Sequence, residues 1–122
     1  MSWVQQTIAE FGRSIGIPNL AFNDRGLIQL AFESGAVLCL ETVEEDILVY
    51  LSVEVPALTT DLKLRVLSLC HYKRQWPFPV QAGLRDANHL VFLVRLPERT
   101  LSLATLNQAI DLLWRLHSMA RG

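Results

Sequence analysis

The chain has 122 residues, a hydrophobic fraction of 51%, a charged fraction of 19% and a formal net charge of −1. This length predicts one compact domain over residues 1–122, and the near-neutral charge argues against a nucleic-acid-binding protein, which needs many lysines and arginines to neutralise phosphates. No apolar run is long enough to predict a membrane span, and the N-terminus lacks the basic and apolar regions of a signal peptide.

The first segment predicts an amphipathic helix. Ser2 is a suitable N-cap, Gln5 follows at capping-box spacing, and Gly16-Ile17-Pro18 ends the pattern. The helix has an apolar stripe along one side. Gly12 lies beside this stripe, which suggests that the helix packs closely against a neighbour. Trp3 lies off the stripe, where it either caps the core or is exposed for a partner. The stripe itself consists of Val4, Ile8, Phe11 and Ile15.

Three short strands are predicted next, over Leu27 to Phe32, Ala36 to Glu41 and Ile47 to Val53. Turns are predicted between them, at Glu33-Ser34-Gly35 and from Thr42 to Asp46. In each strand the side chains alternate between two faces. The short links predict an antiparallel meander.

The segment from Leu62 to His71 predicts a helix that is apolar on two opposite faces. Thr59 or Thr60 caps it, and it is expected to run to about Tyr72. A helix of this kind lies between two bodies. One is the domain itself, and we expect the other to be a second protein. The two faces are Leu62, Val66, Leu69 and Cys70 on one side and Leu64, Leu67 and His71 on the other.

The last third of the chain predicts a loop, two strands and a helix. The loop Trp76-Pro77-Phe78-Pro79 either anchors a partner or folds back onto the core. Val80 to Leu84 is a weak strand, whereas His89 to Leu96 is apolar at both even and odd positions and needs cover on both faces. A helix starts near Ser102. Its apolar face consists of Leu103, Leu106, Ile110, Leu113, Trp114 and His117, and Ala109, Leu112 and Leu116 widen it.

The order of these elements predicts an α+β fold of the type α-β-β-β-α-β-β-α. We expect a twisted antiparallel sheet with its helices mainly on one face. Because a domain of this size leaves surplus apolar side chains outside its core, exposed patches are expected, and such patches usually bind partners. The alternative is a monomer with a well-filled core.

The sequence shows no constellation typical of an enzyme. The histidines His71, His89 and His117 are isolated, and Cys70 and His71 point about 100° apart on a helix, so they do not form a nucleophile and base pair. Metal-ligand spacings and glycine-rich phosphate loops are missing as well, so no cofactor is expected. Cys39 and Cys70 are expected to be reduced and buried in a cytoplasmic protein.

Segments spread along the whole chain carry a family resemblance in their collinear order. They are Met1-Ser2-Trp3, Gly12 to Pro18, Leu27 to Leu30, Gln81-Ala82-Gly83, Leu90-Val91-Phe92, and Glu98 to Leu101 followed by Leu106 to Ala109. With these segments the chain resembles the small class I chaperones of type III secretion, and among them the chaperones of the YopN-type secretion gatekeeper.

This resemblance implies a dimeric cytoplasmic chaperone without nucleotide, cofactor or catalysis. It implies binding of the N-terminal segment of a secreted gatekeeper or effector in extended form, with strands added at sheet edges and apolar side chains seated in grooves. The expected partner chain is a second small chaperone of the YscB type, with a homodimer as the alternative for the isolated chain. Peripheral association with the secretion apparatus at the inner membrane is also expected. The near-neutral charge departs from the acidic character of many such chaperones.

The same resemblance suggests two sets of candidate residues. The candidate dimer interface is Leu62, Leu64, Val66, Leu69, Val91 and Leu93. The candidate cargo-binding residues are Trp3, Leu27, Ala31, Val37 and Leu48. For the strand residues, burial beneath a helix is an equal alternative. A small α+β ligand-sensing or scaffold module and an enzyme using Cys70 or a histidine are the competing functions.

Overall fold

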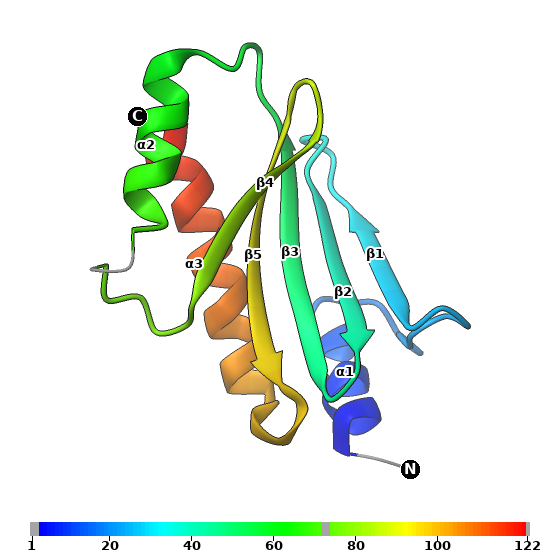
Figure 1. The fold of residues 1–122 in the computed structure, drawn as a ribbon. Helices are drawn as coiled ribbons and strands as arrows, with labels where there is room; N and C mark the ends of the chain where they lie inside the picture. The colour runs from blue at the N-terminus through cyan, green and yellow to red at the C-terminus, as the bar shows by residue number, and fades with distance from the viewer. Residues whose placement is uncertain (1–2, 72–73, 122) are drawn as a thin grey trace.

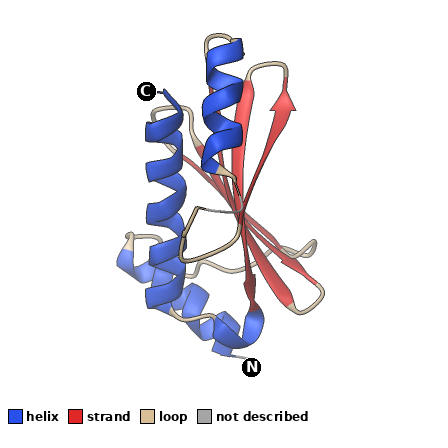
Figure 2. Ribbon diagram, turned by 60° about the vertical axis from the view of Figure 1, so that its left-hand side comes forward, coloured by secondary structure: helices blue, strands red, loops and turns tan. Residues whose placement is uncertain are grey.

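In the computed structural model, which describes residues 3–71 and 74–121, three helices lie on one side of a five-stranded antiparallel sheet (Figure 1). Figure 2 turns the sheet almost edge-on and shows its other face without a helix. The predicted α+β fold and order of elements are therefore confirmed. The elements are α1 (Trp3–Ser14), β1 (Leu27–Ala31), β2 (Val37–Val43), β3 (Asp46–Glu54), α2 (Thr60–Leu69), β4 (Val80–Asp86), β5 (His89–Pro97), the 3-10 turn η1 (Glu98–Thr100) and α3 (Leu103–Arg121).

The sheet has the strand order β1-β2-β3-β5-β4, so the predicted meander is confirmed and β1 and β4 form the two edges. Leu38 lies opposite Leu51, which lies opposite Phe92. Directly paired residues share a face, so this register places the apolar side chains of the central strands on the helix side. The helix-free face, which we call the open face, carries the alternate residues, among them Val37 and Val91.

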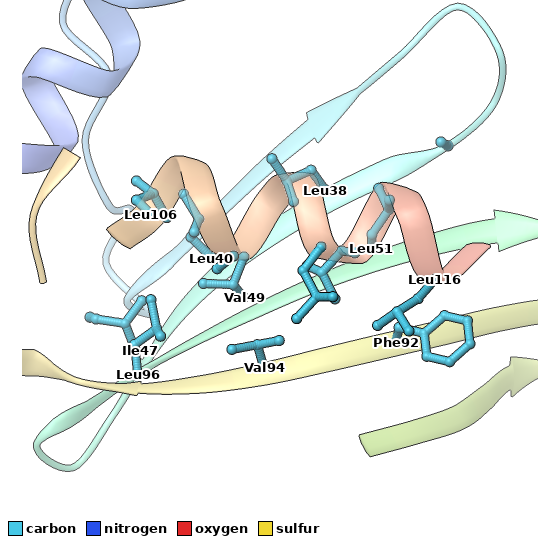
Figure 3. Close-up of a cluster of buried hydrophobic side chains, with 14 of the residues drawn as sticks. Leu38, Leu40, Ile47, Val49, Leu51, Phe92, Val94, Leu96, Leu106 and Leu116 are labelled. Carbon is cyan, nitrogen blue, oxygen red and sulfur yellow. The ribbon is translucent and has the colours of Figure 1, made fainter. Parts of the chain in front are cut away.

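The core lies between α3 and the sheet. Figure 3 shows Leu106 and Leu116 of α3 above Leu40, Val49 and Phe92 of the strands, and all five are fully buried. Burial of such a side chain is worth about 1.5–3 kcal/mol relative to exposure. The wide apolar face predicted for the last helix is thus confirmed. Its buried residues are Leu106, Ala109, Leu112, Leu113, Leu116, His117 and Ala120.

The ends of two helices follow from local hydrogen bonds. Thr59, one of the two predicted caps, accepts a hydrogen bond from Leu62 N at 3.1 Å and begins α2. At α3, Ser102 Oγ accepts from Thr105 N at 3.1 Å while Thr105 Oγ1 accepts from Ser102 N at 2.9 Å, a reciprocal capping arrangement. The predicted Ser2 cap and the predicted helix end at Tyr72 lie outside the described residues, and α2 itself ends at Leu69.

Two local predictions were wrong. The turn expected from Thr42 to Asp46 is shorter, because Val43 pairs with Asp46 and only Glu44 and Glu45 connect the strands. Glu44 has φ 55°, the left-handed conformation that a two-residue hairpin requires. Ile15, expected on the buried stripe of the first helix, is 45% exposed because it follows the last turn of α1.

The loop at Trp76 folds back onto the domain. Trp76 Nε1 donates to Leu69 O at 2.7 Å, and its ring lies within 6 Å of the guanidinium carbons of Arg74 and Arg115, at 5.9 and 5.7 Å. Trp76 and Phe78 both pack partly buried against the core. Of the two alternatives for this loop, closure of the core is the one that the structure shows.

Candidate binding surfaces

The outer face of α2 is exposed, as expected for a helix that lies between two bodies. Leu64 is 59% and Leu67 is 67% exposed, and Leu84 on the neighbouring edge strand β4 is 56% exposed. Between α2 and β4 lies a groove of about 300 Å³, which we call the α2–β4 groove. Its lining is almost wholly apolar. It includes Leu58, Val66, Leu67, Ala82, Leu84 and Leu90.

The predicted dimer residues on α2 divide between the core and this groove. Leu62 and Leu69 are buried at 6% and 3% exposure inside the chain's own core, because their stripe faces α3. Arg65 fixes that contact by donating from Nε to Ala120 O at 2.7 Å. Leu64 remains on the surface, and Val66 is half-buried in the groove.

The open face gathers residues that the sequence had assigned to different sites. Val91 and Leu93, predicted for the dimer, lie on it together with four of the residues predicted for cargo. Strand parity places them there, since Val37 pairs with Ser52, which pairs with Val91. No helix of the described residues covers these side chains, which are half-buried except for the exposed Ala31. The cargo candidates on this face are Leu27, Ala31, Val37 and Leu48.

A second cavity lies where the end of α1, the edge strand β1 and α3 meet, and it is lined by apolar side chains together with Gln29, Asn107 and Asp111. This α1–β1 hollow has a volume of about 550 Å³. Ile15, Ile17 and Phe32 project into it with 45%, 37% and 40% exposure. Phe32 packs edge-on against Trp114 of α3 with 5.4 Å between ring centroids. No pattern in the sequence indicates this site, because its residues come from segments far apart in the chain.

The edge of β1 beside this hollow has free main-chain groups. Gly26 O accepts a hydrogen bond from Thr42 N, and Phe32 N donates one to Ala36 O. The main-chain N–H and C=O groups of the even-numbered residues therefore point toward β2. Gln29 and Ala31 therefore turn their amide and carbonyl groups outward. Leu27 is closed off, because Asn23 bonds both its N–H and its C=O. Ala31, a predicted cargo residue, thus lies at an open strand edge.

Trp3 lies away from that hollow. It starts α1, whereas Ile15 follows the end of the helix, and 12 residues of helix span about 18 Å. Its side chain is 51% exposed and Nε1 donates to Glu98 O at 3.2 Å. Trp3 therefore both ties α1 to η1 and presents an aromatic surface.

The ionisable groups of the interior are held in their neutral forms. Burial raises the pKa of the Cys39 and Cys70 thiols and lowers the pKa of His117. A protonated thiol is a poor nucleophile. Within residues 3–71 and 74–121, no three His, Cys, Asp or Glu side chains converge as metal ligands, and no helix is long and apolar enough to span a membrane.

Solved structures with the same fold place the chain in a class. The crystal structure of the ExsC–ExsE complex matches with a TM-score of 0.77 and 21% identity, covering 98% of this chain and 92% of that one. The Yersinia pestis type III secretion chaperone SycH, in complex with a fragment of YscM2, matches with a TM-score of 0.71 and 14% identity, covering 95% and 98%. The fold is that of the type III secretion chaperones.

The family follows from the sequence relatives. The family model described as type III secretory system chaperone SycN matches residues 3–120. Chaperone protein SycN of Yersinia enterocolitica is 31% identical over 117 residues, covering 95% of this chain and 94% of the relative, and that of Yersinia pseudotuberculosis serotype I is 30% identical over the same coverage. The chain belongs to the SycN family of type III secretion chaperones, which are not enzymes. The family resemblance is confirmed, and this membership argues against the ligand-sensing alternative.

Proposed function

We propose that this chaperone binds the N-terminal segment of a secreted gatekeeper or effector in extended form. It keeps that segment competent for secretion and helps to bring it from the cytoplasm to the export apparatus at the inner membrane. Membership of the SycN family supports the proposal, as does the complex of the similarly folded SycH with a fragment of YscM2. The observation that carries it is the α1–β1 hollow beside the free edge of β1.

The hollow and the strand edge suit one ligand together. An extended peptide that pairs with the outward groups of Gln29 and Ala31 gains main-chain hydrogen bonds. Alternate side chains of that peptide point to one face of the sheet, and those on the helix side enter the hollow near Ile17 and Phe32. The main chain supplies affinity and the hollow selects apolar side chains.

We further propose that the α2–β4 groove holds a second small chaperone of the YscB type, or a second copy of this chain in isolation. Leu64, Leu67 and Leu84 are the exposed anchors, with Val66 in the groove between them. Leu62 lines the groove although only 6% of it is exposed, whereas Leu69 fills the chain's own core and does not line the groove. Exposed apolar patches of this kind usually mark partner sites.

The open face remains a candidate surface for the rest of the cargo. Leu27, Val37 and Leu48 stay in the proposed cargo set, and Val91 and Leu93 join it because they share the same face. Cargo that continues past the strand edge reaches these residues by crossing from β1 onto the open face. Trp3 also stays in the proposed cargo set, as a separate contact, because it starts α1 on the helix side of the sheet.

Co-expression with the N-terminal segment of a candidate gatekeeper tests the cargo site. We expect the chaperone to protect that segment from protease, and the double variant Ile15→Ser with Ile17→Ser to abolish protection without unfolding. Gln108→Ser, an exposed change on α3, is the matched control. Full protection by the double variant would remove the α1–β1 hollow from the proposal.

A further inference from the structure

The open face contains a hollow in which polar side chains lie among apolar ones, and neither the family nor the proposed cargo route explains these polar groups. Its volume is about 360 Å³, and side chains from all five strands line it. We call it the Ser52 hollow. Its main lining residues are Leu27, Cys39, Tyr50, Ser52, Arg85 and Val91.

Ser52 is a buried hydroxyl without a partner. Its side chain is 2% exposed, and among the described residues Oγ has no hydrogen bond. Its neighbours across the two adjoining strands are Val37 and Val91, which offer no polar side-chain group. Since most buried polar atoms in proteins are hydrogen-bonded, a bound group that enters the hollow is a natural partner for Ser52.

Arg85 brings positive charge to the same hollow. No carboxylate of the described residues lies within ion-pair distance of its guanidinium, which lies at the end of β4. Strand register places Glu41, Asp46, Glu54 and Asp86 on this face of the sheet, and each has another partner. The Tyr50 hydroxyl donates to Glu41 Oε1 at 3.0 Å and Asn88 Nδ2 donates to Glu54 Oε1 at 3.3 Å. Asp46 pairs with Arg95, and Asp86 Oδ2 lies 3.3 Å from His89 Nδ1. The donors that line the hollow and remain for a ligand therefore include the Ser52 hydroxyl and the Arg85 guanidinium, beside the Gln29 carboxamide.

We propose that the Ser52 hollow binds the carboxylate of an aspartate or glutamate side chain in the extended client polypeptide. Ser52 Oγ donates one hydrogen bond and Arg85 supplies an ion pair, while Leu27 and Val91 pack against the methylene groups. A positive side chain without a counter-charge selects a carboxylate over a carboxamide. This assignment rests on the proposed function and adds a specificity element to it.

Nuclear magnetic resonance titration of the full chain tests the chemistry directly. The probes are N-acetyl-aspartate N-methylamide, its asparagine counterpart and acetate. We expect saturable chemical-shift changes of the Ser52 amide and the Arg85 side-chain N–H with the blocked aspartate, and none with the asparagine probe or acetate. Equal binding of the asparagine probe, equal binding of acetate, or no saturable shift with the blocked aspartate would each overturn the proposal.

Two variants separate this role from a structural one. Ser52→Ala and Arg85→Gln should each weaken binding of the blocked aspartate about tenfold or more, since each removes a charge-assisted bond. Ser52→Ala should not lower the Tm of the free protein, because the hydroxyl that it removes has no partner there. A lowered Tm would mean that the hydroxyl is satisfied within the fold and would contradict the proposal. Arg99→Gln on η1 is the matched control.

The client complex distinguishes this inference from the proposed function. In a protected client segment, the acidic residues can be replaced by asparagine and glutamine. This change should reduce the affinity of the segment for the wild-type chaperone, and it should reduce the affinity for the Arg85→Gln variant much less. If the segment is protected but neither change matters, the Ser52 hollow is not used and the proposed function stands. If no segment is protected while blocked aspartate still binds, the proposed function fails and the carboxylate site stands.

Discussion

His117 shows how a single side chain couples this fold to pH. It is 2% exposed on the apolar face of α3, where its ring meets Phe92 edge-on at 4.8 Å between centroids. Nε2 and Leu51 O are 2.8 Å apart, so Nε2 carries the proton and donates to that carbonyl. The sequence placed His117 on this face but gave no indication of its partner.

Acidification should destabilise the protein through His117. Burial lowers its pKa below 6.5 in the folded state, and the charge of Arg121 acts in the same direction, against the opposing bond to Leu51. The unfolded state therefore binds the proton more readily than the folded state. The free energy of unfolding is highest above the pKa of His117 in the unfolded chain, and it declines as the pH falls through and below that pKa. Thermal unfolding between about pH 7.5 and about pH 5 measures this. His117→Gln should show a flatter dependence, and equal slopes for both proteins would contradict the assignment.

Gly12 is predicted to tolerate no larger residue. A Cβ there would lie 2.6 Å from Ile17 O and 2.6 Å from Leu20 Cβ. The close packing expected from the sequence thus exists, and its partner is the loop after α1. Gly12→Ala should cost about 1–3 kcal/mol in the free energy of unfolding, measured with urea. Gly83→Ala, which has open space around the added methyl group, should cost much less.

At the scale of elements, α2 combines two roles on opposite faces. Leu62 and Leu69 hold it against the core, and Leu64 and Leu67 point away from it. The N-cap at Thr59 and the bond from Arg65 to α3 fix the helix in this orientation. A substitution on the outer face therefore tests assembly without testing folding.

Leu67→Asp should abolish dimerisation and leave the Tm of the monomer almost unchanged. The side chain is 67% exposed in the single chain, so its change affects folding little, whereas an unpaired carboxylate in an apolar interface is costly. Light scattering after size-exclusion chromatography measures the mass, and Gln108→Asp is the control. Val66→Asp should also break the dimer, but it disturbs the core as well because Val66 packs against it. Normal assembly of Leu67→Asp would move the interface away from α2.

The whole molecule has one core and a surplus of apolar surface. A single buried cluster joins all three helices to the sheet, yet eight large hydrophobic side chains among the described residues stay exposed. With a net charge of −1, little self-repulsion opposes association. Stability should therefore depend on partners.

The Tm of the wild-type chain should rise with protein concentration. Binding of a second copy to the folded state alone shifts the unfolding equilibrium by mass action. Calorimetry over a wide concentration range measures the shift, and Leu67→Asp should remove it. If the Tm of the wild-type chain does not depend on concentration, the chain does not self-associate through the α2–β4 groove. The YscB-type chaperone would then be the remaining proposed partner for that groove.

Much of the fold could be predicted because it depends on local periodicity. The stripe of Leu62, Val66 and Leu69 and the alternation in Ile47 to Val53 identify a helix and a strand without any tertiary contact. The errors arose where one backbone angle or a chain end decided the outcome, as at Glu44 and Ile15. The candidate sites were less predictable. The two apolar faces of α2 were predicted correctly, but the sequence did not predict which of them packs against the core.

The sequence by itself determined the elements, their order and the family, because periodicity and collinear motifs are properties of neighbouring residues. Only the tertiary structure decided which distant segments share a surface. Strand pairing brought Val91 to the open face beside Leu27 and Ser52, and packing of the end of α1 beside β1 made the hollow at Ile17. Surfaces of this kind depend on contacts between residues far apart in the chain, and a pattern of near neighbours does not specify those contacts.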